Sequence, residues 1–180
     1  MPMPPRRARL TVGCCCLSAG LLILAAGCRS ETGRSLSDVM EEVRARFPAV
    51  EQVSTDDLAR ELASPESPRP VLVDVRCEAE YAVSHLRGAE RAETVGEVEA
   101  LVHGDKNASL VLYCSVGYRS SQLASALLGA GFHHVRNLEG SIFKWANEGK
   151  PVYRDGHPVR AVHPYNDDWG RLLDRELWQR

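Results

Sequence analysis

The chain has 180 residues, of which 44% are apolar and 26% are charged, and this balance excludes a wholly disordered chain and a protein with many membrane spans. Its formal charge of −2 does not supply the concentrated basic surface of a general nucleic-acid binder. Six cysteines are too few for a chain of this length to be a small fold stabilised mainly by disulfides. The length suits one domain of roughly 100–150 residues with extensions at its ends.

Residues 1–27 predict an export signal rather than part of the fold. Three arginines precede an uncharged run from Leu10 to Ala26, and a basic start followed by an apolar middle and small residues is typical of a secretory signal. The run ends in Leu-Ala-Ala-Gly before Cys28, which resembles a bacterial lipobox. This resemblance implies cleavage before Cys28 and attachment of a lipid to that cysteine.

We therefore expect an exported bacterial lipoprotein that is held to the membrane by its N-terminal lipid and faces the periplasm or the cell exterior. Two alternatives stay open. The uncharged run of 17 residues could be an uncleaved anchor helix, although it is short for ~30 Å of hydrocarbon. It could also be an ordinary signal cut at an Ala-x-Ala-like site. Cleavage before Cys28 would leave a chain with a formal charge of −5.

Residues 28–52 predict a polar tether followed by an amphipathic helix. Apolar residues recur at helical spacing from Leu36 to Phe47, with charged residues between them. Pro48 ends this helix because its ring cannot continue the hydrogen-bond pattern.

Residues 53–152 predict an α/β domain. Ser54 or Thr55 can cap a short helix. The other expected elements are buried strands at 71–75, 110–113 and 134–138, a short piece at 89–92, and helices that begin at Glu78, Val95 and Ser120. Strands that alternate with helices predict βαβ units and a parallel sheet.

Residues 153–180 predict a C-terminal extension. An Asp-Gly pair at 155–156 lies between apolar neighbours and predicts a small hairpin. Asp167 or Asp168 can cap a final helix that carries Trp169 and three leucines along one side. Because tryptophans are costly to leave in water, we expect this helix to dock on the domain rather than to serve as a partner-binding arm.

Cys114 is the strongest candidate for a catalytic residue. It follows a buried strand and comes just before a helix, at the sheet edge where open α/β folds bind ligands. Backbone N–H groups of a tight loop that leads into a helix attract an anion, and Arg119 adds a positive charge. Gly117 permits the positive φ that such a loop often needs. These features predict a lowered pKa and a reactive thiolate for Cys114.

The spacing of this loop separates two enzyme classes. Tyrosine-type phosphatases need an Arg after Cys and five further residues, but position 120 of this chain is Ser. Rhodaneses typically read Cys-Arg-x-Gly-x-Arg, and Cys114, Gly117 and Arg119 match that spacing. The loop therefore resembles that of a rhodanese.

Three further segments resemble the same family in the same order. Residues 74–81 are similar to its Asp-x-Arg … Glu-Tyr segment, residues 84–89 to its Gly-His-Ile-x-Gly-Ala, and residues 138–145 to its closing Leu-x-Gly-Gly-x-x-x-Trp. Residues 53–152 thus resemble a single-domain rhodanese. The resemblance implies a three-layer fold in which a five-stranded parallel sheet carries helices on both faces.

The resemblance also implies sulfur transfer without a metal ion or another cofactor. The Cys114 thiolate would take a sulfane sulfur from a small sulfur-containing anion such as thiosulfate, carry it as a persulfide, and pass it to a thiophilic acceptor such as a thiol. Asp74 and Arg76 would support the end of their strand. The loop residues expected to bind the donor are Ser115, Val116, Gly117, Tyr118 and Arg119.

Some of the chemistry stays open at the level of sequence. Ser115 stands where thiosulfate-using relatives often carry Arg, and one cation fewer predicts weaker affinity for a dianion. The chain could instead be a non-catalytic persulfide carrier for a membrane redox partner, or a thiol–disulfide protein in which Cys77 resolves Cys114. Such a disulfide needs Cα atoms within about 7 Å. No feature of the sequence identifies a protein partner.

Overall fold

The computed structural model describes residues 33–66 and 68–180 of the chain. The expected export signal at residues 1–27 and the expected lipid site, Cys28, lie outside this part. Within it, no helix is both long enough and apolar enough to cross a membrane.

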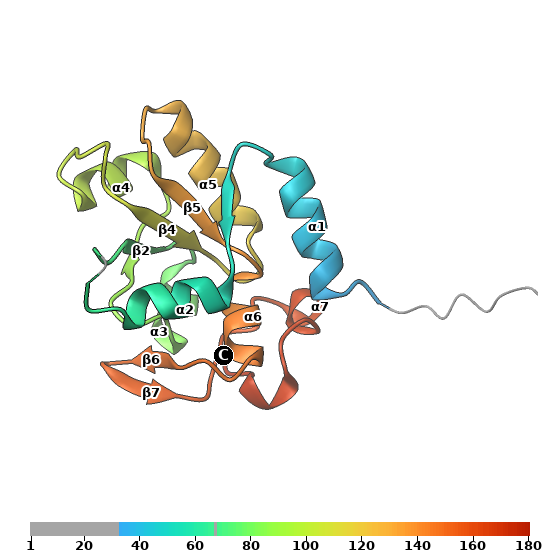
Figure 1. The fold of residues 1–180 in the computed structure, drawn as a ribbon. Helices are drawn as coiled ribbons and strands as arrows, with labels where there is room; N and C mark the ends of the chain where they lie inside the picture. Colours follow the sequence, from blue (N-terminus) through green and yellow to red (C-terminus); the bar gives the residue numbers. More distant parts are fainter. Residues whose placement is uncertain (1–32, 67) are drawn as a thin grey trace, which may run out of the picture. The chain divides into compact units, whose positions relative to one another are not determined.

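Five parallel strands form the central sheet, in the order β1-β5-β4-β2-β3 (Figure 1). Strand β4 lies at the centre and is buried at every position, which explains its continuous apolar sequence. The strands are β1 (Glu51–Val53), β2 (Val71–Asp74), β3 (Glu90–Arg91), β4 (Leu110–Tyr113) and β5 (Val135–Leu138). The predicted five-stranded parallel sheet is confirmed.

Helices cover both faces of this sheet, as expected. They are α1 (Leu36–Arg46), α2 (Thr55–Ala63), α3 (Glu78–Val83), α4 (Val95–Leu101), α5 (Tyr118–Gly129) and α6 (Ser141–Asn147). Alternate residues of a strand point to opposite faces. Leu72 and Val111 therefore belong to one hydrophobic core with α1, α2 and α6, whereas Val73 and Leu112 belong to a second core with α4 and α5.

Capping side chains place the starts of several helices. Ser35 and Asp38 form a capping box at α1. Ser54 rather than Thr55 caps α2, where its hydroxyl accepts a hydrogen bond of 3.0 Å from the N–H of Asp57. Helix α5 begins at Tyr118, two residues before the predicted start.

Strand β1 is an element that the sequence did not predict. It has three residues at the edge of the sheet and pairs with β5, Val53 opposite Leu138. So short an edge strand carries almost no alternating pattern. It begins at Glu51, so the sheet takes in residues just before the domain start expected at 53. Residues Gly33–Arg180 form one structural unit.

The expected hairpin is present as β6 (Val152–Arg154) and β7 (His157–Val159), but the expected final helix is wrong. One turn, α7 (Asp167–Gly170), is followed by a separate 3₁₀ turn, Arg175–Leu177. Neither Asp167 nor Asp168 is the cap. The side chain of Asn166 instead accepts a hydrogen bond of 2.9 Å from the N–H of Trp169.

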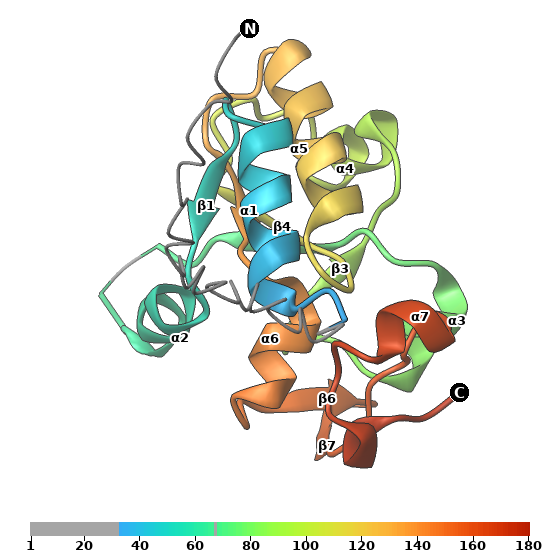
Figure 2. The ribbon, with the colours of Figure 1, turned by 90° about the vertical axis from the view of Figure 1, so that its right-hand side faces the viewer.

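Gly170 leaves room for the chain to pack on the end of this helix. A Cβ at that position would lie 2.5 Å from the indole ring of Trp178, because the chain folds back and packs Trp178 onto the end of α7. Figure 1 and Figure 2 show α7 at the same end of the domain as α6. The amide of Asn147 ties α6 to the last residues, since it donates to the carbonyl of Leu172 and accepts from the N–H of Asp174, both at 2.9 Å. The expected docking of the extension is confirmed.

Candidate active site

The cysteine loop runs from the end of β4 to the start of α5, residues 114–119, and the first residues of α6 hold it in place. The N–H of Cys114 donates to the hydroxyl of Ser141 at 3.1 Å. The carbonyls of Cys114 and Ser115 accept from the N–H groups of Ile142 at 3.2 Å and Phe143 at 3.1 Å. The segment at 138–145 that resembles the closing rhodanese motif therefore supports the cysteine loop.

Hydrogen-bond donors surround the Cys114 thiol, which is 1% exposed. The N–H of Gly117 donates to its Sγ at 3.2 Å. Burial by itself would raise the pKa of Cys114, but the charge of Arg119 and hydrogen bonds from Ser120 and Gly117 outweigh it. The pKa of Cys114 is therefore lowered, in the direction expected from the sequence.

Gly117 takes the conformation that the sequence predicted for it. Its φ is 104°, in the region that favours glycine. A Cβ there would also lie 3.3 Å from the side-chain nitrogen of Asn137, whose side-chain oxygen accepts a hydrogen bond of 2.6 Å from the hydroxyl of Ser120. The glycine thus lets the loop turn directly into α5 while its N–H faces the thiol.

Arg119 is paired with a carboxylate that the sequence did not single out as a site residue. Its two terminal nitrogens donate to the oxygens of Glu80 at 2.8 and 2.7 Å. The hydroxyl of Ser115 donates to Glu80 at 3.0 Å and accepts from Arg119 at 3.1 Å. Glu80 is 1% exposed. Its burial would raise its pKa, but Arg119 lowers that pKa to about 2, so Glu80 stays ionised and matches the charge of Arg119.

Glu80 also connects the loop to Cys77, because its carboxylate accepts the N–H of Cys77 at 3.2 Å. The sequence contained one signal for this residue, its place in the Glu-Tyr pair at 80–81. Among the described residues Cys77 and Cys114 are free thiols, Cys77 exposed at the start of α3 and Cys114 buried.

A cavity of about 160 Å³ opens over Cys114. Its lining residues are Cys114, Ser115, Val116, Tyr118, Arg119, Tyr165 and Trp169. Four of the five loop residues expected to bind the donor therefore line the cavity, and Gly117 contributes its N–H to the thiol instead. Tyr165 and Trp169 come from the C-terminal extension, and no sequence pattern assigned them to the site.

Asp74 and Arg76 do not line this cavity. Both are fully buried. The carboxylate of Asp74 accepts from Nε of Arg76 at 2.9 Å and from Nη2 at 2.6 Å, and Nη2 also donates to the carbonyl of Ser84 at 2.6 Å. Burial opposes the charge of Arg76, but the Asp74 carboxylate holds its pKa above the ordinary value. The pair ties the end of β2 to the chain after α3.

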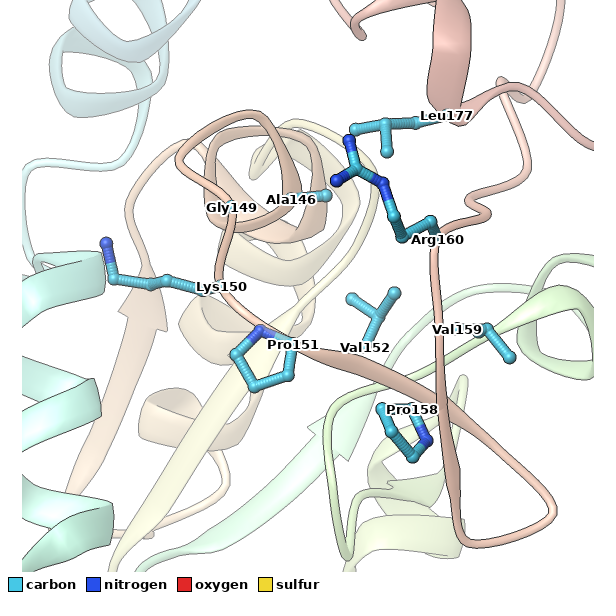
Figure 3. A pocket seen from close by; sticks show the side chains of 9 residues that line it. All are labelled: Ala146, Gly149, Lys150, Pro151, Val152, Pro158, Val159, Arg160 and Leu177. Atoms are coloured by element: carbon cyan, nitrogen blue, oxygen red, sulfur yellow. The ribbon is translucent and has the colours of Figure 1, made fainter.

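A second cavity, of about 270 Å³, lies beside the hairpin (Figure 3). It is lined by Ala146, Gly149, Lys150, Pro151, Val152, Pro158, Val159, Arg160 and Leu177. Its lining holds no thiol, and both of its cations contact carboxylates, as Arg119 does. Lys150 contacts Asp56 and Glu148, and Arg160 contacts Glu176. The cavity over Cys114 is therefore the candidate active site.

Comparison with known proteins identifies the family of the domain. The family profile of the rhodanese-like domain matches residues 54–148. A sulfurtransferase of Allochromatium vinosum is 31% identical over 103 residues, which cover 57% of this chain and 94% of the relative. The probable adenylyltransferase/sulfurtransferase MoeZ of Mycobacterium tuberculosis is 33% identical over 82 residues, 44% of this chain and 21% of the relative. The chain spans only about a quarter of the length of the first curated relatives that it matches.

A solved structure shares the fold. The rhodanese-like domain of a protein from Anabaena has a TM-score of 0.51 and 25% identity, and the match covers 58% of this chain and 80% of that one. The parallel sheet, the cysteine loop and the family profile identify the same domain. The chain belongs to the rhodanese-like family.

Proposed function

We propose that this protein is a sulfurtransferase that carries a sulfane sulfur as a persulfide on Cys114. The observation that carries the proposal is the Cys114 thiol itself, buried at the end of β4, with a lowered pKa and with the N–H of Gly117 at 3.2 Å from its sulfur. Relatives named as sulfurtransferases support the same reaction class.

The reaction proceeds in two displacements. The Cys114 thiolate attacks the outer sulfur of the donor and forms a new S–S bond, while the old S–S bond breaks and its electron pair leaves with the remainder of the donor, as sulfite when the donor is thiosulfate. The loop N–H groups stabilise the anionic persulfide. An acceptor such as cyanide or a thiolate then takes the outer sulfur and releases the Cys114 thiolate, so one transfer is divided into two steps.

The main effect of Arg119 is on the Cys114 thiol. Its charge lowers the pKa of Cys114, whereas its guanidinium is already bound on two nitrogens by Glu80. Within the described lining of the cavity, Arg119 is the one cation, and Ser115 occupies the position after the cysteine. A dianion gains little from a cation whose charge is already matched, so thiosulfate serves as a weak donor.

Trapping the persulfide tests the proposal. After incubation with a sulfane-sulfur donor, we expect intact-protein mass spectrometry to show a gain of one sulfur, about 32 Da, that maps to the peptide with Cys114. The gain should disappear after addition of cyanide, with thiocyanate as product. Cys77→Ser is the matched control and keeps the gain. Sulfur that maps to Cys77, or no gain with any donor, would refute the carrier role of Cys114.

We further propose that Cys28 carries a lipid that anchors the exported protein to the membrane. The support is the lipobox-like sequence before Cys28. In a bacterial host, we expect the wild-type protein to incorporate labelled palmitate and to sediment with membranes, and Cys28→Ser to lose both properties. Cys16→Ser, in the same apolar run, is the control and keeps them. Membrane retention of unlabelled protein at full mass would favour an uncleaved anchor helix instead.

A further inference from the structure

Two aromatic side chains of the C-terminal extension form part of the wall of the cavity over Cys114. Tyr165 and Trp169 line it together with Val116 and Tyr118 of the cysteine loop. The guanidinium carbon of Arg119 lies 4.8 Å from the centre of the Tyr165 ring. Both aromatic residues lie beyond the part of the chain that matches the family profile, residues 54–148. They belong to the C-terminal extension, outside the family match.

Specific contacts hold this part of the extension in place. The hydroxyl of Ser84 donates to the carbonyl of Ala161 at 2.5 Å, and the N–H of Val162 donates to the carbonyl of Leu177 at 2.7 Å. Asn166 caps the turn that carries Trp169, and the guanidinium of Arg34 lies 4.9 Å from the ring of Trp169. Because these contacts order the segment before any ligand binds, its rings form a wall that is already in position.

The chemistry of the lining differs from that expected for a small inorganic dianion. Apart from the thiol, the serine and one arginine paired with Glu80, the described lining consists of valine, tyrosine and tryptophan side chains. An apolar cavity of about 150 Å³ has room for one benzene ring, and this one measures about 160 Å³. Tyr165 is 47% exposed, the largest exposure of a big apolar side chain in the described part, so it has a face free for a ligand.

We propose that Tyr165 and Trp169 determine the specificity of the site for sulfane-sulfur donors with an apolar organic body, that is, for organic persulfides rather than inorganic thiosulfate. The inference rests on the proposed sulfur transfer through Cys114. The thiolate attacks the outer sulfur of R–S–S⁻, the donor S–S bond breaks, R–S⁻ leaves with the electron pair, and Cys114 becomes the persulfide. The body R packs between the two aromatic rings while this exchange occurs.

Thiosulfonates test this inference because their body can be changed without changing the transferred sulfur. In R–SO₂–S⁻ the outer sulfur passes to Cys114 and the sulfinate R–SO₂⁻ leaves with the electron pair. The readout is kcat/KM for thiocyanate formation with benzenethiosulfonate divided by that with methanethiosulfonate. We expect wild-type protein to favour the benzene compound at least about tenfold. Tyr165→Ala and Trp169→Leu should each reduce this ratio by about tenfold, and Tyr165→Phe should preserve it.

Tyr153→Ala is the matched control. Tyr153 is an aromatic residue of the same extension but belongs to the hairpin strand β6 and does not line the cavity. The Tyr153→Ala substitution should leave the ratio of the two kcat/KM values at the wild-type value. A wild-type ratio near one, or a ratio that Tyr165→Ala and Trp169→Leu leave unchanged, would overturn the inference while sulfur transfer stands. No thiocyanate from either compound with wild-type protein would overturn the proposed function itself. The turnover of methanethiosulfonate shows in each variant that the protein is folded.

Discussion

Replacing Cys114 with serine is expected to lower sulfur-transfer turnover by at least about 10³-fold, since loss of a catalytic nucleophile removes the covalent route altogether. A serine hydroxyl has nearly the size of the thiol, but it stays protonated at neutral pH and cannot carry a sulfane sulfur. The hydrogen bonds that shape the loop come from the backbone of Cys114 and from α6, so they survive the change. Thiocyanate formation measured with methanethiosulfonate and cyanide checks the result.

The matched control for this prediction is Cys77→Ser, which removes the other thiol of the described part. It should keep turnover within about twofold of the wild-type rate. The pH profile gives a second readout. Because the pKa of Cys114 is lowered, the rate constant of the wild-type protein should rise with pH as the thiolate forms and level off below the range of an ordinary thiol. Residual turnover of Cys114→Ser above one tenth of the wild-type rate would mean that another group accepts the sulfur.

Replacing Asp74 with asparagine is expected to reduce the free energy of unfolding by about 3–5 kcal/mol, the usual cost of leaving one charge of a buried ion pair without its partner. Asparagine has the shape of aspartate and can still accept a hydrogen bond, so the loss comes from the charge. Arg76 is fully buried, and its Nη1 atom has no hydrogen-bond partner among the described residues even in the wild-type protein. The charge of Glu80 also acts on Arg76, but in that part of the chain Asp74 is the carboxylate that accepts hydrogen bonds from the Arg76 side chain.

Chemical denaturation measures this loss, with Asp168→Asn as the control. Asp168 and its partner Arg171 are 3.6 Å apart, and both side chains are more than three-quarters exposed, so this surface pair should contribute little to stability. Equal losses of unfolding free energy in the two variants would show that the buried Asp74–Arg76 pair stabilises the fold no more than an exposed ion pair does. A larger loss for Asp74→Asn, together with an unchanged denaturant slope, is the expected result.

The local parts of the site could be predicted because their physical cause is local. A continuous apolar run predicted β4, the residues after it predicted a loop with Cys114 at the end of the strand, and Gly117 supplied the one conformation with positive φ that the loop needs. The spacing of Cys114, Gly117 and Arg119 also carried the family resemblance. Strand, cysteine, glycine and helix start lie close together in the chain, so their order could be predicted, whereas the contacts of α6 that hold the loop could not.

The remaining features of the site and of the fold depend on contacts between residues that are far apart in the chain. Local sequence patterns do not predict such contacts. Arg119 and Glu80 are 39 positions apart, and only the packing of α3 against the cysteine loop makes Glu80 the partner of Arg119. The final helix was predicted too long, and where the structure ends it the chain folds back and packs Trp178 against Gly170, a contact that no local pattern shows.

The sequence by itself determined the candidate nucleophile Cys114, the glycine of its loop and the alternation of strands and helices that predicts a parallel sheet, since these follow from neighbours in the chain. The tertiary structure decided what surrounds the nucleophile. It pairs the charge of Arg119 with Glu80, and it brings Tyr165 and Trp169 to Cys114 across about fifty residues of chain. The physical reason is that the identity of a reactive group depends on its own side chain, whereas its charge balance and the shape of its cavity depend on whichever elements pack against it.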